Sequence, residues 1–184
     1  TATTLLPSYR TPGQQTFFSY RGTSGDVLGT YADGERIRIT PQAYYTNGSF
    51  LALGEYARVS QDVTRVTPTS GTRSASLDHS AWQIQLAWFA TREEQSIRGF
   101  KPNSVFSPKD GTWGAWELAA RYHELDIDDD AFEGGADSFA NPATAASKAR
   151  AWGVGVNWYL NQNYKWSLNY EVTRFDGGAA TGDR

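Results

Sequence analysis

The stretch Trp-Gly-Val-Gly-Val-Asn-Trp-Tyr-Leu, residues 152–160, decides the fold class of this chain. Large apolar side chains occupy every second position and alternate with glycine, asparagine and tyrosine. Because successive side chains of a β-strand point to opposite faces, this period of two predicts a strand whose faces meet different environments. After the turn 161–163 the alternation resumes over 164–173, where Trp166, Leu168 and Tyr170 share one face. The two segments predict an antiparallel hairpin of long strands.

The same alternation predicts five further strands upstream, so that the chain holds seven strands in hairpin succession. They are expected at 15–22, 35–46, 50–64, 76–91 and 113–127. Several are longer than the ~5–6 residues common in soluble sheets and sufficient for the ~9–11 residues of a tilted membrane strand. Aromatic residues near both ends of the apolar faces also favour an antiparallel transmembrane β-barrel. The sequence therefore predicts an all-β fold of one domain, residues 1–184.

The connections between these strands differ in length at the two ends. One end has the long loops 22–34, 65–75 and 128–148, and the other has the short turns 47–49 and 161–163 together with the long connection 92–111. Outer-membrane barrels have short periplasmic turns and longer extracellular loops. Most of the connections follow this asymmetry.

Two strands contain residues that complicate a regular pattern. Pro41 predicts a bulge or an edge position in 35–46, because proline has no N–H for a ladder. Asn47-Gly48 predicts a tight hairpin turn directly after it. In 50–64, Glu55 falls on the side of Leu51, Leu53 and Val59. A carboxylate on an apolar face requires a bulge, a subunit contact or an error in the register expected for this strand.

The composition narrows the class of protein. With 184 residues and no cysteine, the chain is predicted to be one domain without disulfides. It lacks a run of the ~20 apolar residues that a membrane helix needs. The net charge of −3 argues against a nucleic-acid partner. The absence of methionine and of an apolar leader predicts a mature or internal piece of a protein.

Several strings resemble the phosphate-selective porin O/P family. They are Gly-Ala-Trp-Glu-Leu-Ala-Ala-Arg-Tyr within 112–126, Asn-Trp-Tyr-Leu-Asn at 157–161, and upstream stretches at 10–21, 41–45 and 54–56. The resemblance covers nearly the whole chain. It implies about seven strands of a 16-stranded barrel, that is, the C-terminal half without its last strand. The chain is therefore expected to be a fragment of a longer porin.

The resemblance also implies a function. Porins of this family are homotrimers in the outer membrane of Gram-negative bacteria and pass phosphate, polyphosphate or other small anions. The expected partners are therefore these anions, the lipid bilayer and lipopolysaccharide, and neither an enzymatic activity nor a cofactor is expected. The lysine cluster on the family's constriction loop comes from the N-terminal half of the barrel. Phosphate selectivity is therefore implied by resemblance alone.

If the tryptophan-rich faces meet lipid, the opposite faces line water. The cations predicted to point into this lumen and form a path of weak anion sites are Arg21, Arg36, Arg38, Arg58, Arg121 and Lys165. The tryptophans predicted to face lipid are Trp82, Trp88, Trp116, Trp152, Trp158 and Trp166. In the alternative interpretation, the arginines pair with Asp62, Glu117 and Glu171 and only stiffen the wall.

Other sites and functions are weaker hypotheses. Asp126, Asp128 and Asp130 have the spacing of a calcium loop, but Ala131 stands where that loop needs glycine. His79 and His123 lack a third ligand nearby, so no metal site is predicted. A general porin, or one selective for other oxyanions, remains an alternative. A soluble β-sandwich that binds carbohydrate on its tryptophans is an alternative of a different class.

Overall fold

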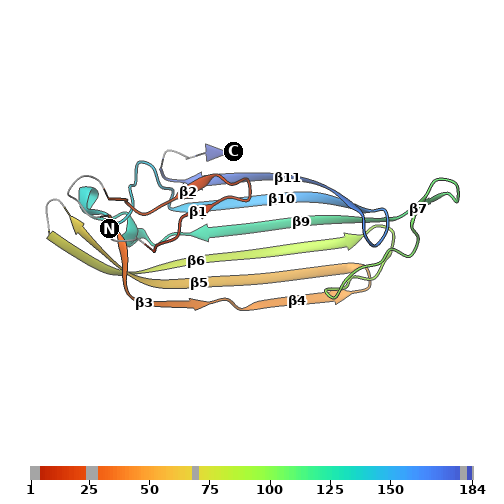
Figure 1. Ribbon diagram of the computed structural model, residues 1–184, viewed down its shortest axis with the longest axis horizontal. Helices are drawn as coiled ribbons and strands as arrows, with labels where there is room; N and C mark the ends of the chain where they lie inside the picture. The colour runs from red at the N-terminus through yellow and green to blue at the C-terminus, as the bar shows by residue number, and fades with distance from the viewer. Residues whose placement is uncertain (1–4, 24–28, 68–70, 179–181, 184) are drawn as a thin grey trace.

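The computed structural model describes residues 5–23, 29–67, 71–178 and 182–183 of the chain. Its dominant element is one curved antiparallel sheet of long strands (Figure 1). In chain order these are β3 (Tyr31–Ile39), β4 (Gln42–Asn47), β5 (Phe50–Thr67), β6 (Gly71–Phe89), β9 (Ala115–Asp126), β10 (Lys148–Tyr159), β11 (Lys165–Asp176) and β12 (Gly182–Asp183). The spatial order is β12-β11-β10-β9-β6-β5-β3, with β4 also paired to β5. The predicted all-β antiparallel fold is confirmed.

Smaller elements lie outside the main sheet. They are β1 (Tyr9–Arg10), β2 (Thr16–Phe18), β7 (Phe106–Ser107), β8 (Thr112–Trp113) and the short 3₁₀ turns η1 (Asp129–Ala131) and η2 (Gly135–Asp137). β1 pairs with β2, and β7 pairs with β8. Among the described residues, no helix has the length and apolar character needed to cross a membrane.

The hairpins at the short-turn end follow the prediction. β10 and β11 pair from Trp158 opposite Trp166 to Lys148 opposite Asp176 without a shift of register. β4 and β5 are joined through Gly48, whose φ of +55° is the left-handed conformation that a tight hairpin turn requires. β3 and β4 follow one another along the same edge of β5, and the break between them contains Pro41, as predicted.

The strands of the β5–β6 hairpin are longer than predicted. The segment 65–75 was expected to be a loop, but β5 continues to Thr67 and β6 begins at Gly71. Its residues are paired, for example Val66 with Thr72 and Thr64 with Ser74. Threonine and valine are β-branched and favour strands, so a stretch rich in Ser and Thr is not necessarily a loop. Residues 68–70 lie outside the described residues.

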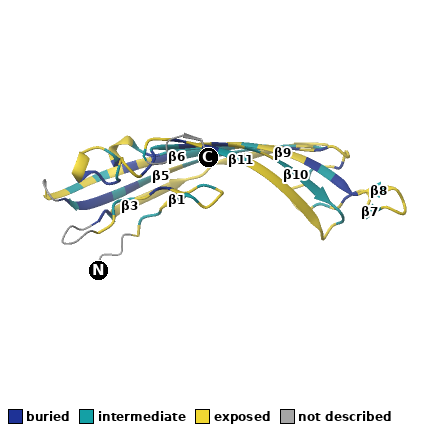
Figure 2. Cartoon of the chain, turned by 90° about the horizontal axis from the view of Figure 1, so that it is seen from above, coloured by how far each residue is buried: buried dark blue, intermediate teal, exposed yellow. Residues whose placement is uncertain are grey.

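The predicted first strand, 15–22, is wrong. Only Thr16–Phe18 is a strand, and it pairs with β1 and not with the main sheet. Residues 5–23, here called the inner segment, lie along the concave side of the sheet (Figure 2). The physical reason is that the neighbours Phe17 and Phe18 are both buried, whereas a strand between lipid and water would bury alternate residues.

The inner segment helps to form the hydrophobic core found among the described residues. Phe17 and Phe18 pack there with side chains from β5, β6, β10, β11 and the connection 127–147. The fully buried members of this core include Phe18, Val63, Leu77, Ile127, Phe139 and Phe175. The core lies toward the long-loop end, and it fixes the inner segment against the concave face.

The shape of the sheet argues against a β-sandwich. In a sandwich a second sheet would cover the tryptophan-rich face, but in the described part of the chain that face is exposed. The sheet is also open within the described residues, ending at β12 on one side and at β3 and β4 on the other. Open edges with unpaired backbone groups require further strands or another cover.

Candidate functional site

The strand registers define a concave face and a convex face. Tyr56 pairs with Trp82, and Ile84 pairs with Tyr122, which pairs with Trp152. Residues in these positions, and every second residue along the strands, point to the convex face. Their chain neighbours, such as Glu55, Gln83, Arg121 and Asn157, point to the concave face beneath the inner segment.

The convex face carries a broad exposed belt of large apolar side chains, here called the outer belt. Its exposed members are Phe50, Tyr56, Trp82, Ile84, Leu86, Trp88, Leu118, Tyr122, Trp152, Val154, Trp166, Leu168 and Tyr170. At the short-turn end Trp158 pairs with both Trp116 and Trp166. All six tryptophans predicted to face lipid therefore share the convex face. An apolar surface of this extent marks contact with a partner or a membrane.

Toward the long-loop end, the convex face changes from apolar to charged. Arg58 pairs with Asp78 at 2.8 Å, and Arg150 pairs with Asp176. Lys148 contacts Asp126 at 2.7 Å and Glu124 at 3.5 Å. The prediction that Arg58 shares a face with Arg36 and Arg38 is wrong. Both faces of β5 carry apolar residues, and only its pairing with β6 shows which of them continues the outer belt.

Arg36 and Arg38 lie on the concave face, where they pair with Gln61 and Val59 of β5. Both line a cavity of about 300 Å³ together with Tyr9 of the inner segment and His79 of β6. Both side chains are exposed, and within the described residues neither forms an ion pair. Their guanidinium groups are thus available to a solute on the concave side.

Arg121 and Lys165 also lie on the concave face but differ in their partners. Arg121 donates to Glu171 across β10 at 2.7 Å, as the alternative interpretation of a stiffened wall predicted for such pairs. Lys165 is exposed at the short-turn end, with its ammonium 5.5 Å from the centre of the Tyr159 ring. One of these two cations is therefore neutralised, and the other meets solvent.

Arg21 is not part of the wall of the sheet. Its Nε donates to Ser138 Oγ and its Nη2 donates to the Gly135 carbonyl, each at 3.2 Å. Arg21 thus ties the inner segment to the connection around η2. The prediction that it belongs to a lumen-lining strand fails because 15–22 is not a strand of the main sheet.

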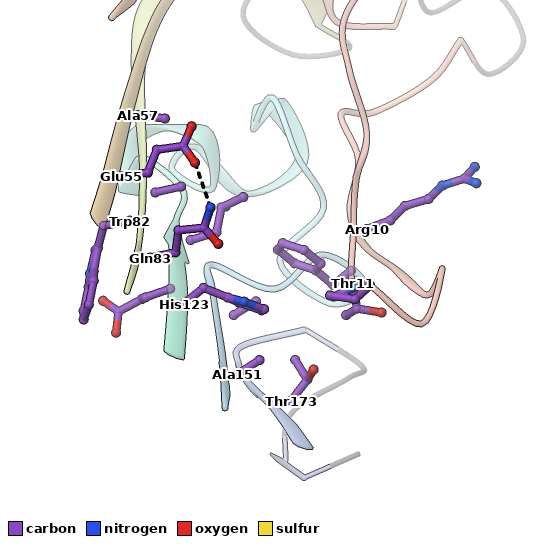
Figure 3. Close-up of a pocket in the computed structure, with 15 residues that line it drawn as sticks. Arg10, Thr11, Glu55, Ala57, Trp82, Gln83, His123, Ala151 and Thr173 are labelled. Atoms are coloured by element: carbon purple, nitrogen blue, oxygen red, sulfur yellow. Dashed lines mark hydrogen bonds between the residues drawn. The ribbon is translucent and has the colours of Figure 1, made fainter. Parts of the chain in front are cut away.

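Glu55 lies in a cavity of about 280 Å³ between the inner segment and the sheet (Figure 3). Its carboxylate accepts a hydrogen bond from Gln83 Nε2 at 2.7 Å. Thr11 lies across the cavity, whereas the Arg10 side chain points away from it. Glu55 is therefore on the polar concave face. The expected register of this strand was therefore wrong by one residue, because Tyr56 and not Glu55 pairs with Trp82 on the convex face.

The remaining candidates have structural partners. His79 contacts Tyr20 at 2.7 Å and accepts from the Asp128 N–H at 3.2 Å. The Asp128 carboxylate accepts from the backbone N–H groups of Asp78 and Asp130. In the described part of the chain, no group of three His, Asp or Glu side chains is suited to a metal ion. No local sequence pattern signals the contact between His79 and Tyr20, because the two residues are 59 positions apart.

Comparison with known proteins identifies the family. The family model described as phosphate-selective porin O and P matches residues 20–177. Porin O from Pseudomonas aeruginosa is 28% identical over 163 residues, which make up 86% of this chain and 34% of that porin. The chain thus spans about a third of the length of the curated relative it matches. The family is one of porins. The chain belongs to the phosphate-selective porin O and P family.

Proposed function

We propose that this chain forms part of the wall of an outer-membrane β-barrel that passively conducts small anions of the phosphate type. The observation that carries the proposal is the contrast between the two faces of one sheet. The convex face bears the outer belt, and the concave face bears Arg36, Arg38 and a series of polar side chains. Lipid outside and water inside match this contrast.

The dimensions of the outer belt support a membrane location. From Trp166 to Val172, the apolar positions of β11 cover roughly 20 Å along the strand at ~3.3 Å per residue. A strand tilt of ~35–45° reduces this to roughly 15 Å across the membrane, which fits within the ~25 Å height of the apolar band of such barrels. The charged pairs begin beyond the belt, at the long-loop end. By the usual asymmetry of these barrels, that end faces the cell exterior. Bilayer lipid, lipopolysaccharide at the outer leaflet and two further protomers in a trimer are the proposed partners.

The arginines of the concave face suit weak anion binding. A guanidinium group offers paired N–H donors to an oxyanion. A channel requires sites that the ion can leave. Exposed arginines such as Arg36 and Arg38, which form no ion pair with any described residue, suit this role better than enclosed ones. Arg121 is already paired with Glu171, and it is expected to contribute less.

Planar-bilayer recording on the detergent-purified protein tests the proposal. The parent channel is expected to prefer anions to cations, and Arg36→Gln and Arg38→Gln should each lower that preference. Arg58→Gln is the matched control, because it removes the same charge from the convex face. Equal effects of all three variants would contradict the assigned anion path. The ratio of the conductance in phosphate to the conductance in chloride is compared with the ratio of the aqueous mobilities of the two anions. A conductance ratio no greater than the mobility ratio would favour a general porin.

A further inference from the structure

We propose that Glu117 is a positioning residue that latches residues 92–101, here called the rim segment, onto the concave face and so narrows the short-turn mouth of the channel. The inference deepens the proposed channel function and rests on it. The rim segment belongs to the connection 92–111, which is the exceptionally long connection at the short-turn end. The structure gives this unusual length a role.

The Glu117 carboxylate is enclosed, and both of its oxygens accept hydrogen bonds. Its side chain lies on the concave face of β9, and the residue is only 8% exposed. One oxygen accepts from Gln95 Nε2 at 2.9 Å. The other accepts from Asn157 Nδ2 at 2.7 Å and from the Tyr159 hydroxyl at 3.1 Å. A buried carboxylate is stable only when such donors replace water, so the rim segment supplies a bond that Glu117 needs.

Two further contacts hold the rim segment over the same face. The Gln95 N–H donates to the Gly48 carbonyl in the β4–β5 turn at 2.8 Å. The Phe100 ring stacks on Phe89 at 4.4 Å and meets the edge of Tyr159 at 4.6 Å. Phe89 and Tyr159 belong to β6 and β10. The rim segment therefore reaches across the concave wall and does not extend away from the sheet.

The position of the rim segment matters for ions because it carries exposed cations. Its exposed cations are Arg92, Arg98 and Lys101, against one exposed acid, Glu94, and Lys165 lies at the same end of the sheet. Closure of the rim segment reduces the open cross-section of the mouth and keeps its excess of exposed positive charge beside it. Release is expected to raise conductance and to lower the preference for anions, because cations near a mouth concentrate anions there.

Variants of Gln95 separate the latch from the rest of the wall. Gln95→Ala removes the donor of the rim segment but leaves Asn157 and Tyr159 on Glu117. Gln95→Glu places a second carboxylate against Glu117 and should release the rim segment more strongly. The double variant Gln95→Glu with Glu117→Gln exchanges acceptor and donor and should restore the latch. Gln83→Ala is the matched control, because Gln83 donates to Glu55 within the sheet.

The experiment uses the detergent-purified protein and has two readouts. Trypsin cleavage after Arg98 reports opening of the rim segment whether or not the protein conducts. Bilayer recording in potassium phosphate and in potassium chloride reports conductance and anion preference. We expect Gln95→Ala to accelerate cleavage roughly tenfold, a typical effect for the loss of a hydrogen bond to a charged group. Gln95→Ala and Gln95→Glu should raise conductance, and the double variant should return both readouts toward the parent values.

Each other outcome overturns a defined claim. If trypsin cleaves Gln95→Ala and Gln95→Glu no faster than it cleaves Gln83→Ala, the proposed latch is excluded. Faster cleavage with unchanged conductance would exclude narrowing of the mouth by the rim segment. A parent protein that conducts no ions would overturn the proposed channel function and the narrowing with it, while the cleavage rates would still decide whether Glu117 holds the rim segment.

Discussion

Tyr20 and His79 join the inner segment to the sheet, with the Tyr20 hydroxyl 2.7 Å from Nε2 of the imidazole. Because Nδ1 accepts the Asp128 N–H, Nε2 carries the proton and donates to the Tyr20 oxygen. The Phe18 ring meets the same imidazole with a centroid distance of 5.7 Å. The hydrogen bond between Tyr20 and His79, which lies among aromatic rings, therefore helps to hold the inner segment against the concave face of the sheet.

Tyr20→Phe should lower the free energy of unfolding by about 1–3 kcal/mol, because the enclosed His79 N–H loses its acceptor. Urea titration of the protein in detergent micelles, followed by tryptophan fluorescence, measures this change. Tyr44→Phe is the control, since Tyr44 is an exposed tyrosine of β4 and should change stability little. Similar losses for both variants would show that the His79 contact contributes no specific stability.

Alkaline pH should destabilise the parent protein through the same residue. Burial raises the pKa of Tyr20 above its ordinary value of 10.0, and the nearby Tyr9 adds to the shift. The unfolded chain therefore loses this proton first, and the free energy of unfolding falls as the pH rises past about 10. Urea titrations at several alkaline pH values should show a shallower decline for Tyr20→Phe. An identical pH slope in both proteins would contradict this linkage.

Leu168 and Asn169 are chain neighbours on opposite faces of β11, and they test the assignment of those faces. Leu168 is 77% exposed within the outer belt, and Asn169 lies on the concave face. If the belt meets the bilayer core, Leu168→Arg should lower the free energy of unfolding in lipid vesicles, and so destabilise the protein, by about 2–4 kcal/mol. Asn169→Arg should cost much less, because it places the charge in water. The opposite ranking would reverse the two faces.

The ion pair between Arg121 and Glu171 masks a cation of the concave face. Glu171→Gln should therefore increase the permeability of anions relative to cations, measured as a shift of the reversal potential in a salt gradient. The comparable variant Asp78→Asn releases Arg58 on the convex face and should leave the reversal potential unchanged. An equal shift from both variants would imply a general effect of net charge and not a local one on the path.

The sequence alone determined that the chain is built from long antiparallel strands. Where large apolar residues occupy every second position, as in β10 and β11, it also determined which residues share a face. The six tryptophans and the pair Arg36 and Arg38 could be grouped in this way. The reason is local, because the direction of a side chain along a strand follows from the backbone geometry alone.

The tertiary structure decided what depends on partners distant in the chain. β5 has apolar residues on both faces, so only its pairing of Tyr56 with Trp82 placed Arg58 outside and Glu55 inside. The inner segment alternates like a strand around Phe18 and Tyr20, yet both residues pack against the concave face. Nothing in the sequence distinguishes Glu117 from the other acidic residues. Only the structure shows that Gln95, Asn157 and Tyr159 all donate hydrogen bonds to it. Such contacts depend on packing between segments far apart in sequence, and no local pattern encodes them.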